Sequence, residues 1–381
     1  MALLVALAHP YGFGTAAFVD GVYTLILACL GPLRSRIVDH LGQRKALLVM
    51  GVLSAVALGG VAFLVNVSAP WQLVLALVVI AGLVSPPLSA AVRVSWRQVV
   101  NPETDELKVV HSADSVITEV GFILGPTLAG LGFGYLGGAM TYTLAVAASI
   151  AGLVIFLAVA WAHTLRIDGE EADAPPPREV TFLTRVAGPL ADRRMLVILV
   201  PLIGMGFVFG GIGVFTPAYS EHLGIPQTSG IIIAMISVGG VIGGVIYGAL
   251  PWRLGLWKKY VYLGLGFLIP SCFMAFGTNL WSLMLILPLC GLFVTPLYIN
   301  AYLLVDSVIP LRMRHEANAW LGSGTDVANG ISAIVVGTFI SRQDWQGALW
   351  AIAGLAVIGI LSLGLLRNSE ERSVDELQPV A

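Results

Sequence analysis

Three carboxylic acids stand inside long apolar stretches of the sequence, away from the ends of those stretches. They are Asp20, Glu119 and Asp326, and we expect no buried base within these apolar stretches. An unpaired carboxyl in apolar surroundings is protonated more readily than one in water, so it can exchange protons or bind a cation. A charge at the centre of a bilayer costs roughly 2.5–3.5 kcal/mol on insertion scales, so these acids should not face lipid.

Glu119 is our first choice for a proton site. It lies about two turns into the apolar run 111–135, some ~12 Å from its start at 1.5 Å per residue. Asp114 stands nearer the start of the same run and joins the candidate group. The alternative is that Asp114 and Glu119 only cap this helix or pair with Arg93 or Arg97, since structural ion pairs also hold acids at such depths. Asp20 and Asp326 would be partners of Glu119 or sites for a cation.

The composition identifies the solvent around these acids. The chain has 381 residues, of which 57% are hydrophobic and 11% are charged, whereas soluble domains carry about 25% charged residues. This small number of polar residues cannot cover an apolar core. The surrounding solvent must therefore be a lipid bilayer. The net charge of -2 argues against a nucleic-acid partner, and the three cysteines lie in apolar runs. We therefore expect no metal site, no disulfide framework and no cofactor.

Eleven apolar runs are long enough to cross a membrane, which takes about 20 residues. We predict spanning helices at 13–33, 45–66, 71–92, 111–135, 139–164, 194–219, 228–250, 258–277, 281–305, 316–340 and 344–366. Residues 1–8 form a further apolar piece that is too short to cross.

The basic residues divide the connections between these runs into two classes. Of the 20 Lys and Arg, all but Arg342 fall in alternate connections or at span ends on one side. Cytoplasmic loops of membrane proteins carry an excess of Lys and Arg. We therefore predict a multi-pass protein of the cell membrane with its C-terminus in the cytoplasm.

The connection Gly31–Lys45, GPLRSRIVDHLGQRK, is short and basic and contains one acid, Asp39. It resembles the loop between helices 2 and 3 of major facilitator transporters, which usually reads Gly-x-Leu-x-Asp-Arg-x-Gly-Arg-Arg. Asp39, Gly42 and Arg44 match that pattern. Three positions depart from it, namely Ser35, His40 and Gln43. The resemblance implies a conformational latch of Asp39, Gly42 and Arg44, which holds two halves together on the cytoplasmic side in the outward-facing state.

A second motif lies in the run 111–135 and reads GFILGPTLAG from Gly121 to Gly130. It resembles the Gly-x-x-x-Gly-Pro-x-x-Gly-Gly signature of the antiporter branch of major facilitators. Glycines four residues apart allow close approach of helices, and Pro126 removes a backbone donor and kinks the helix. Gly121, Gly125, Pro126 and Gly130 are therefore candidate gate residues. The alternative is a generic packing face of small residues.

One departure limits the antiporter resemblance. Antiporters of this family usually carry an arginine three residues before a glycine in helix 4. Here Val79 stands three residues before Gly82, so a proton relay that uses that arginine is absent. Export therefore rests on the second motif, and uptake stays open as an alternative.

The resemblance implies an all-helical fold of two six-helix bundles related by pseudo-twofold symmetry. If Gly31–Lys45 corresponds to the family's loop between helices 2 and 3, residues 1–8 are the tail of an apparently truncated helix 1. The resemblance also places Asp20, Glu119 and Asp326 on helices that border the interface between halves. The expected parts are an N-terminal bundle at 1–164, a cytoplasmic linker at 165–193, a C-terminal bundle at 194–366 and a cytoplasmic tail at 367–381.

We expect this protein to export a lipophilic small molecule, neutral or cationic, in a proton-coupled process. It would act as a monomer, by alternating access. The alternatives are an uptake permease, a facilitator without proton coupling, a sensor or scaffold, and an intramembrane enzyme. We do not expect an enzyme, because the sequence only approaches the protease motifs: Ala319 stands where the second His of His-Glu-x-x-His belongs, and Gly322–Asp326 misses Gly-x-Gly-Asp by one residue.

Overall fold

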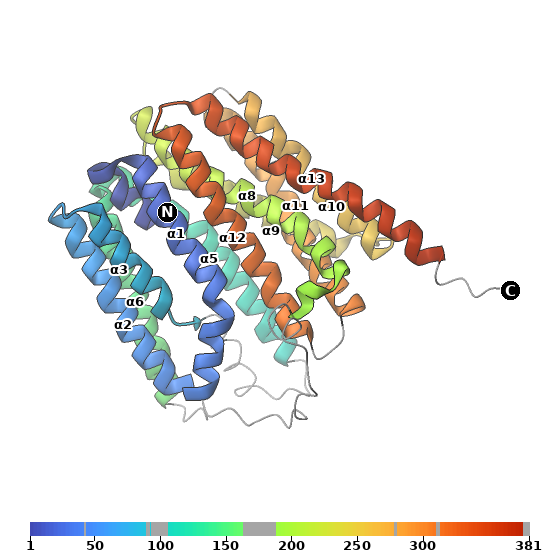
Figure 1. The fold of residues 1–381 in the computed structure, drawn as a ribbon, viewed down its shortest axis with the longest axis horizontal. Helices are drawn as coiled ribbons and strands as arrows, with labels where there is room; N and C mark the ends of the chain where they lie inside the picture. The colour runs from blue at the N-terminus through green and yellow to red at the C-terminus, as the bar shows by residue number, and fades with distance from the viewer. Residues whose placement is uncertain are drawn as a thin grey trace.

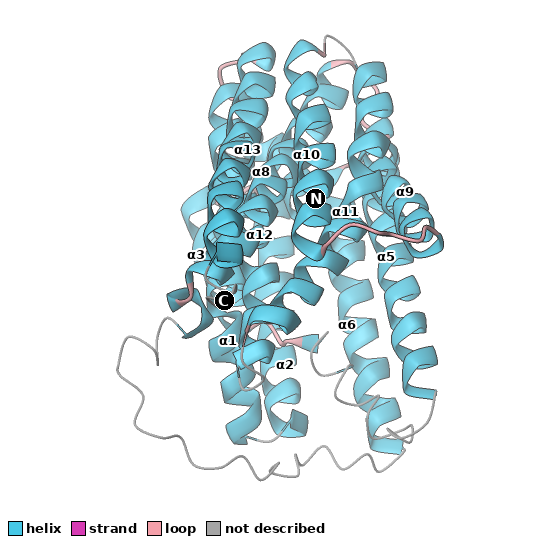
Figure 2. Cartoon of the chain, turned by 90° about the vertical axis from the view of Figure 1, so that its right-hand side faces the viewer, coloured by secondary structure: helices cyan, strands magenta, loops and turns pink. Residues whose placement is uncertain are grey.

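The computed structural model describes residues 1–41, 43–88, 92, 106–162, 188–277, 280–309 and 313–375. These residues form eleven α-helices and two short 3-10 helices. The helices run roughly parallel to one axis (Figure 2). The expectation of an all-helical protein is confirmed for this part of the chain.

The helices fall into a first and a second group, which lie side by side (Figure 1). The first group comprises α1 Ala2–Leu41, α2 Gln43–Asn66, α3 Trp71–Val84, α5 Glu106–Leu136 and α6 Gly138–Ala162. The second group comprises η1 Gly188–Ala191, α8 Arg193–His222, α9 Thr228–Ala249, α10 Leu256–Phe273, η2 Met274–Phe276, α11 Leu280–Val308, α12 Arg314–Ile340 and α13 Trp345–Asp375.

The element α1 differs from its prediction at the C-terminal end. It comprises two helices that meet at a kink at Gly12 (φ 79°), so the apolar piece 1–8 and the predicted span 13–33 are separate helices. A positive φ costs glycine little because it has no Cβ. Beyond residue 33 the helix continues to Leu41, and α2 begins at Gln43. The stretch Gly31–Lys45 is therefore mostly helical and not a loop.

The third predicted span, 71–92, is interrupted. Helix α3 ends at Val84, and Ser85 is extended, with φ −62° and ψ 124°. Pro86 and Pro87 follow, and a residue before proline is forced out of the helical region by the proline ring. Hydropathy alone did not reveal this break, because the apolar run continues past it.

Seven of the described helices are long and apolar enough to cross a membrane, and three shorter ones, Trp71–Val84, Val120–Leu136 and Trp345–Gly359, are apolar as well. Among the seven, α8 is the most deeply buried. The outside of the molecule carries large apolar side chains such as Val56, Leu285 and Leu361. This surface suits contact with lipid tails.

Helix α8 reaches the centre of the second group by close contact with α12. A Cβ built on Gly206 would lie 2.1 Å from the carbonyl oxygen of Thr325. A Cβ built on Gly210 would lie 2.0 Å from that of Asn329. Only glycine allows two backbones to approach so closely, so the small-residue spacing on α8 determines this crossing.

Two seams join the two groups of helices. In the first seam, α1 meets α12: a Cβ built on Gly21 would lie 2.7 Å from the carbonyl oxygen of Gly330, and one built on Gly337 would lie 2.5 Å from the Cβ of Ala17. Gly14, which lies one turn before Ala17 on the same face of α1, similarly abuts Ser341.

In the second seam, α5 meets α9. A Cβ built on Gly230 would lie 1.8 Å from the carbonyl oxygen of Pro126, and one built on Gly130 would lie 2.4 Å from the amide nitrogen of Gly230. Further along, Gly134 abuts Gln227 in the same way.

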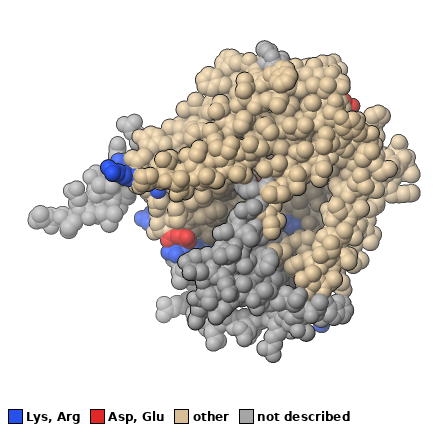
Figure 3. Space-filling model, turned by 180° about the vertical axis from the view of Figure 1, so that it is seen from behind, with Lys and Arg blue, Asp and Glu red and all other residues tan. Residues whose placement is uncertain are grey.

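Both seams lie toward the same end of the molecule, which we call the seam end and which carries the short connections 67–70 and 341–344. The opposite end, where α1 ends and α8 begins, is called the linker end. Toward the linker end α1 and α12 diverge (Figure 1). In the space-filling view from behind, a mostly neutral surface surrounds a hollow (Figure 3). The two groups are thus joined at one end and separate toward the other.

Candidate functional site

Asp326 lies where the two groups of helices begin to separate. On α12 it is one turn before Gly330, on the stripe that continues through Ile334 and faces α1. Its side chain is exposed, on the linker-end side of the α1–α12 seam. The carboxylate is therefore positioned at the inner limit of the space between the bundles.

Aromatic and hydroxyl groups lie beside Asp326. The hydroxyl of Tyr298, on α11, donates to Oγ1 of Thr325 at 3.2 Å, and Tyr298 is close enough to interact electrostatically with Asp326. The ring of Tyr298 stacks on that of Tyr302, with centroids 6.2 Å apart. A carboxylate beside stacked aromatic rings offers both a counter-charge and ring faces to an organic cation.

Asp20 lies on the other side of the same seam. It precedes Gly21 on α1 and is half-buried. Its carboxylate interacts electrostatically with Tyr23 on its own helix and with Tyr142 on α6. Asp20 thus lies at the level of the seam and near groups of the first bundle, about one turn farther from the linker end than Asp326.

The candidate gate residues on α5 occupy two different environments. Gly130 is buried against Gly230, and the carbonyl of Pro126 abuts the same glycine. Gly121 and Gly125 have no atom within 4 Å of a Cβ built on them. The part of the motif from Pro126 onward therefore forms the seam, and the first two glycines face open space.

The other predicted site residues lie beyond what the structure describes. The side chains of Asp114 and Glu119 on α5, and of Asp39 and Arg44 near the linker end, are outside the described residues. Gly42 is outside them altogether.

Arg34 is a buried base that the sequence analysis missed, because Arg34 was placed in a connection after the span 13–33 and not in the helix that continues to Leu41. Only 7% of Arg34 is exposed. Its guanidinium donates to the carbonyl oxygens of Gly82 at 3.4 Å and Ser85 at 3.1 Å, and also to those of Leu27 and Leu30 on α1. The last carbonyls of a helix have no partner within that helix, so Arg34 satisfies the broken end of α3.

The position of Arg34 also bears on the missing helix 4 arginine. Val79, three residues before Gly82, supplies no positive charge, but Arg34 reaches the carbonyl of that same glycine from the neighbouring α1. A signal for this arrangement was present in the sequence: Pro86 and Pro87 end α3 early and leave carbonyls in need of a donor.

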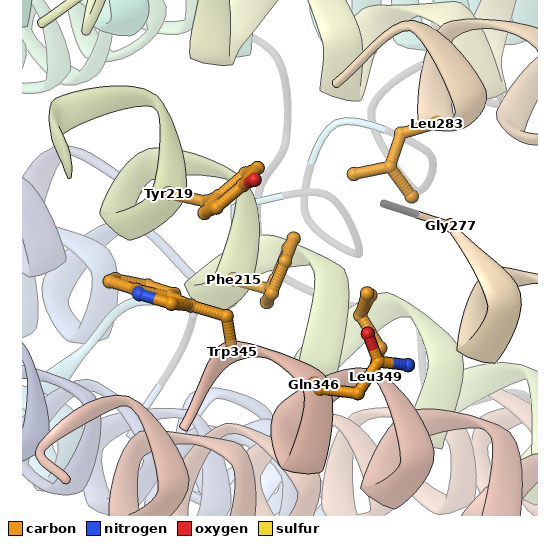
Figure 4. Close-up of a pocket in the computed structure, with 7 residues that line it drawn as sticks. All are labelled: Phe215, Tyr219, Gly277, Leu283, Trp345, Gln346 and Leu349. Atoms are coloured by element: carbon orange, nitrogen blue, oxygen red, sulfur yellow. The ribbon is translucent and has the colours of Figure 1, made fainter. Parts of the chain in front are cut away.

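Two cavities lie at the seam end. The larger, which we call the seam-end cavity, has a volume of about 590 Å³ and is lined in part by Tyr11, Phe13, Glu221, His222, Ser341 and Trp345. The smaller measures about 120 Å³ and lies inside the second group, with Phe215, Tyr219 and Trp345 on its walls (Figure 4). Trp345, the first residue of α13, lines both cavities.

Comparison with known proteins places this architecture in a family. The family model described as Major Facilitator Superfamily matches residues 1–314. The "Multidrug efflux pump Tap" of Mycolicibacterium fortuitum is 23% identical over 371 residues, which cover 92% of this chain and 86% of that protein.

Solved structures agree with this placement. The nucleoside transporter NupG has a TM-score of 0.73 at 17% identity, with 96% of this chain and 94% of that chain covered. A bacterial homologue of the iron transporter ferroportin, in an inward-facing state, has a TM-score of 0.71 at 17% identity, with 96% and 92% covered. The fold and the family resemblance are therefore confirmed. The chain belongs to the Major Facilitator Superfamily and is a multi-pass membrane transporter of small molecules, not an enzyme.

Proposed function

We propose that this transporter exports a lipophilic small molecule in exchange for protons, by alternating access, as a monomer in the cell membrane. The observation that carries the proposal is the position of Asp326, exposed beside Tyr298 where the bundles begin to separate. Such a site is reached from one side of the membrane at a time. The similarity to a protein named as a multidrug efflux pump supports export over uptake.

The proposed orientation places the linker end in the cytoplasm. The basic residues support it, because all but Arg342 of the 20 Lys and Arg are assigned to that side. The seam end is then extracellular, and the conformation described is the inward-facing one. The proposed parts are an N-terminal bundle at 1–164, a cytoplasmic linker at 165–193, a C-terminal bundle at 194–366 and a cytoplasmic tail at 367–381.

The three acids receive different proposed roles. Glu119, on the helix that forms the α5–α9 seam, is the coupling site, because its protonation would be transmitted directly to the gate at Pro126. Asp326 and Asp20 serve as its partners or bind a cationic cargo. The alternative, in which Asp114 and Glu119 only cap α5 or pair with Arg93 or Arg97, predicts no effect on coupling.

Replacing Glu119 by Gln should abolish uphill accumulation of the cation tetraphenylphosphonium in proteoliposomes with an imposed pH gradient. The amide cannot exchange a proton, so the gradient no longer drives transport, whereas exchange of cargo down its own gradient should persist.

Asp326→Asn should instead weaken cargo binding by about tenfold or more, in line with a lost charge-assisted contact.

A matched control for both variants is Asp306→Asn, since Asp306 is an exposed acid at the end of α11, 3.9 Å from Arg314. Unchanged accumulation and pH dependence in Glu119→Gln would show that Glu119 is not the coupling site. Movement of the cargo down its own gradient only, whatever the pH gradient, would favour a facilitator in the unsubstituted protein, and inward accumulation would favour uptake.

Asp39, Gly42 and Arg44 remain the proposed latch of the outward-facing state. In the conformation described, α1 and α12 are apart at the linker end (Figure 1), so the latch belongs to the other state. Asp39→Asn should therefore increase the inward-facing population and slow turnover, with little effect on folding. The measurement is the accessibility of single cysteines at the two ends, with Asp306→Asn again as control; equal accessibility before and after the change would contradict the latch.

A further inference from the structure

The seam-end cavity lies between the two bundles and far from Asp326. One wall comes from α1, with Tyr11 and Phe13 on either side of the break at Gly12, and the opposite wall comes from α8 and α13. Its volume of about 590 Å³ falls within the range of about 300–1,000 Å³ for small-molecule sites. Along α12, Ser341 and Asp326 are separated by roughly 22 Å at 1.5 Å per residue, so the cavity is not part of the site around Asp326.

Glu221 supplies a negative charge with spare bonding capacity to this cavity. Its Oε2 atom is buried and has no hydrogen-bond partner among the residues that the structure describes. A shielded carboxylate oxygen without a donor is unfavourable, and a ligand that brings an N–H group or a positive charge would remove that cost. His9 interacts electrostatically with Glu221 and its own side chain is exposed to solvent, and the imidazole of His222 also lines the cavity.

Aromatic side chains on both walls of the cavity are held in place by their neighbours. Trp345 packs against Tyr219 and His222, with ring centroids 5.3 and 4.9 Å apart. Tyr11, on the facing wall, donates its hydroxyl to the carbonyl oxygen of Ala69 at 2.5 Å, which fixes its ring. Rigid aromatic faces around a carboxylate are the arrangement that proteins use to bind organic cations.

The break in α1 is what brings the facing wall to the cavity. Gly12 takes a left-handed φ of 79°, and no atom lies within 4 Å of a Cβ built on it. Just beyond it, Gly14 abuts Ser341 at the edge of the same cavity. Because α1 and α12 belong to different bundles, parting the α1–α12 seam would open the cavity.

We propose that the seam-end cavity is a second binding site, which takes a lipophilic organic cation with Glu221 as counter-charge and Trp345 and Tyr11 as aromatic walls. The proposal deepens the proposed export and rests on it for the direction of passage: the cation would occupy this site after leaving the central space and before release outside. Binding at the site does not depend on transport.

The test uses the purified protein and tetraphenylphosphonium as the probe. In a background in which Cys29, Cys272 and Cys290 are replaced by alanine, Ser341→Cys places one thiol at the edge of the cavity. Ser68→Cys places the same substitution on the exposed connection between α2 and α3; Ser68 is not itself a lining residue, although its neighbour Ala69 accepts the Tyr11 hydroxyl. The measured quantity is the rate at which a maleimide modifies each thiol with and without the cation.

We expect the cation to slow modification at position 341 about fivefold or more and to leave the rate at position 68 unchanged, since a bound organic cation covers the thiol. Glu221→Gln should remove this protection, and Asp326→Asn should retain it. Trp345→Leu keeps the carboxylate of Glu221 but removes an aromatic ring face. It should raise about tenfold the concentration of the cation that gives half of the full protection. This variant also serves if Glu221→Gln does not fold.

The outcomes separate this site from the proposed export. Absence of protection, or protection that survives Glu221→Gln, overturns the second site. Protection lost in Asp326→Asn also overturns it, because the cation would then act from the central space. Glu221-dependent protection in a protein that fails to accumulate the cation in vesicles supports the site and counts only against export.

Discussion

Replacing Gly230 by leucine should reduce transport about 100-fold while each bundle remains folded. A Cβ at this position would lie 1.8 Å from the carbonyl oxygen of Pro126 and 3.0 Å from the amide nitrogen of Gly130. Both neighbours are backbone atoms, so neither can rotate away. Overpacking costs typically 1–3 kcal/mol, and each 1.4 kcal/mol changes a population about tenfold. The closed seam end would then be rarely formed, and the transport cycle requires it.

The measurement combines transport in proteoliposomes with accessibility of a cysteine placed at Gln227, which abuts Gly134 in the closed seam. Labelling at that cysteine should increase in Gly230→Leu. Gly248→Leu is the matched control, because it is the same change near the end of the same helix, where no atom lies within 4 Å of the added Cβ. Normal transport by Gly230→Leu would show that this seam does not take part in the cycle.

Gly210→Leu should have a larger effect and prevent folding. Its Cβ would lie 2.0 Å from the carbonyl oxygen and 2.8 Å from the Cα of Asn329. This contact is inside the second bundle, between α8 and α12, and not between bundles. A leucine side chain would separate the most buried helix from its main partner, and core changes of this kind exceed the usual destabilisation by point substitutions.

Size-exclusion chromatography and thermal denaturation of the detergent-purified protein test this expectation. We expect aggregated or absent protein for Gly210→Leu and normal protein for Gly213→Leu, which lies one turn away on α8 with no atom within 4 Å of its built Cβ. A folded Gly210→Leu protein would mean that α8 and α12 can separate. Gly230→Leu, by contrast, should remain folded, so the two substitutions distinguish contacts between bundles from contacts within one.

The sequence predicted the helical architecture well because long apolar runs can satisfy their backbone in lipid only as helices. The predictions failed where helix ends depend on single residues. The run 71–92 is apolar throughout, but α3 ends at Val84 before Pro86 and Pro87. The basic stretch Gly31–Lys45 was interpreted as a loop, although its residues Gly31 to Leu41 are helical.

The site was predictable only in outline. The acids Asp20 and Asp326 were expected on helices that border the interface, and α1 and α12 do meet there. The partner of Gly130 was not predictable, because α9 contains several other glycines and only the tertiary arrangement selects Gly230. The burial of Arg34 has the same cause: two of its acceptors, the carbonyl oxygens of Gly82 and Ser85, lie about 50 residues away in sequence.

The glycine seams have a thermodynamic consequence for the transport cycle. Where Gly21 meets Gly330 and Gly130 meets Gly230, closure immobilises no side chain at these positions and buries no charge on them, so it costs little conformational entropy or desolvation. Close contacts between backbones of this type contribute only about 0.5–1 kcal/mol each. Moving a two-state equilibrium from 1:99 to 99:1 takes about 5.5 kcal/mol. The glycine contacts themselves therefore add little to the free energy that the cargo must supply to open the gate.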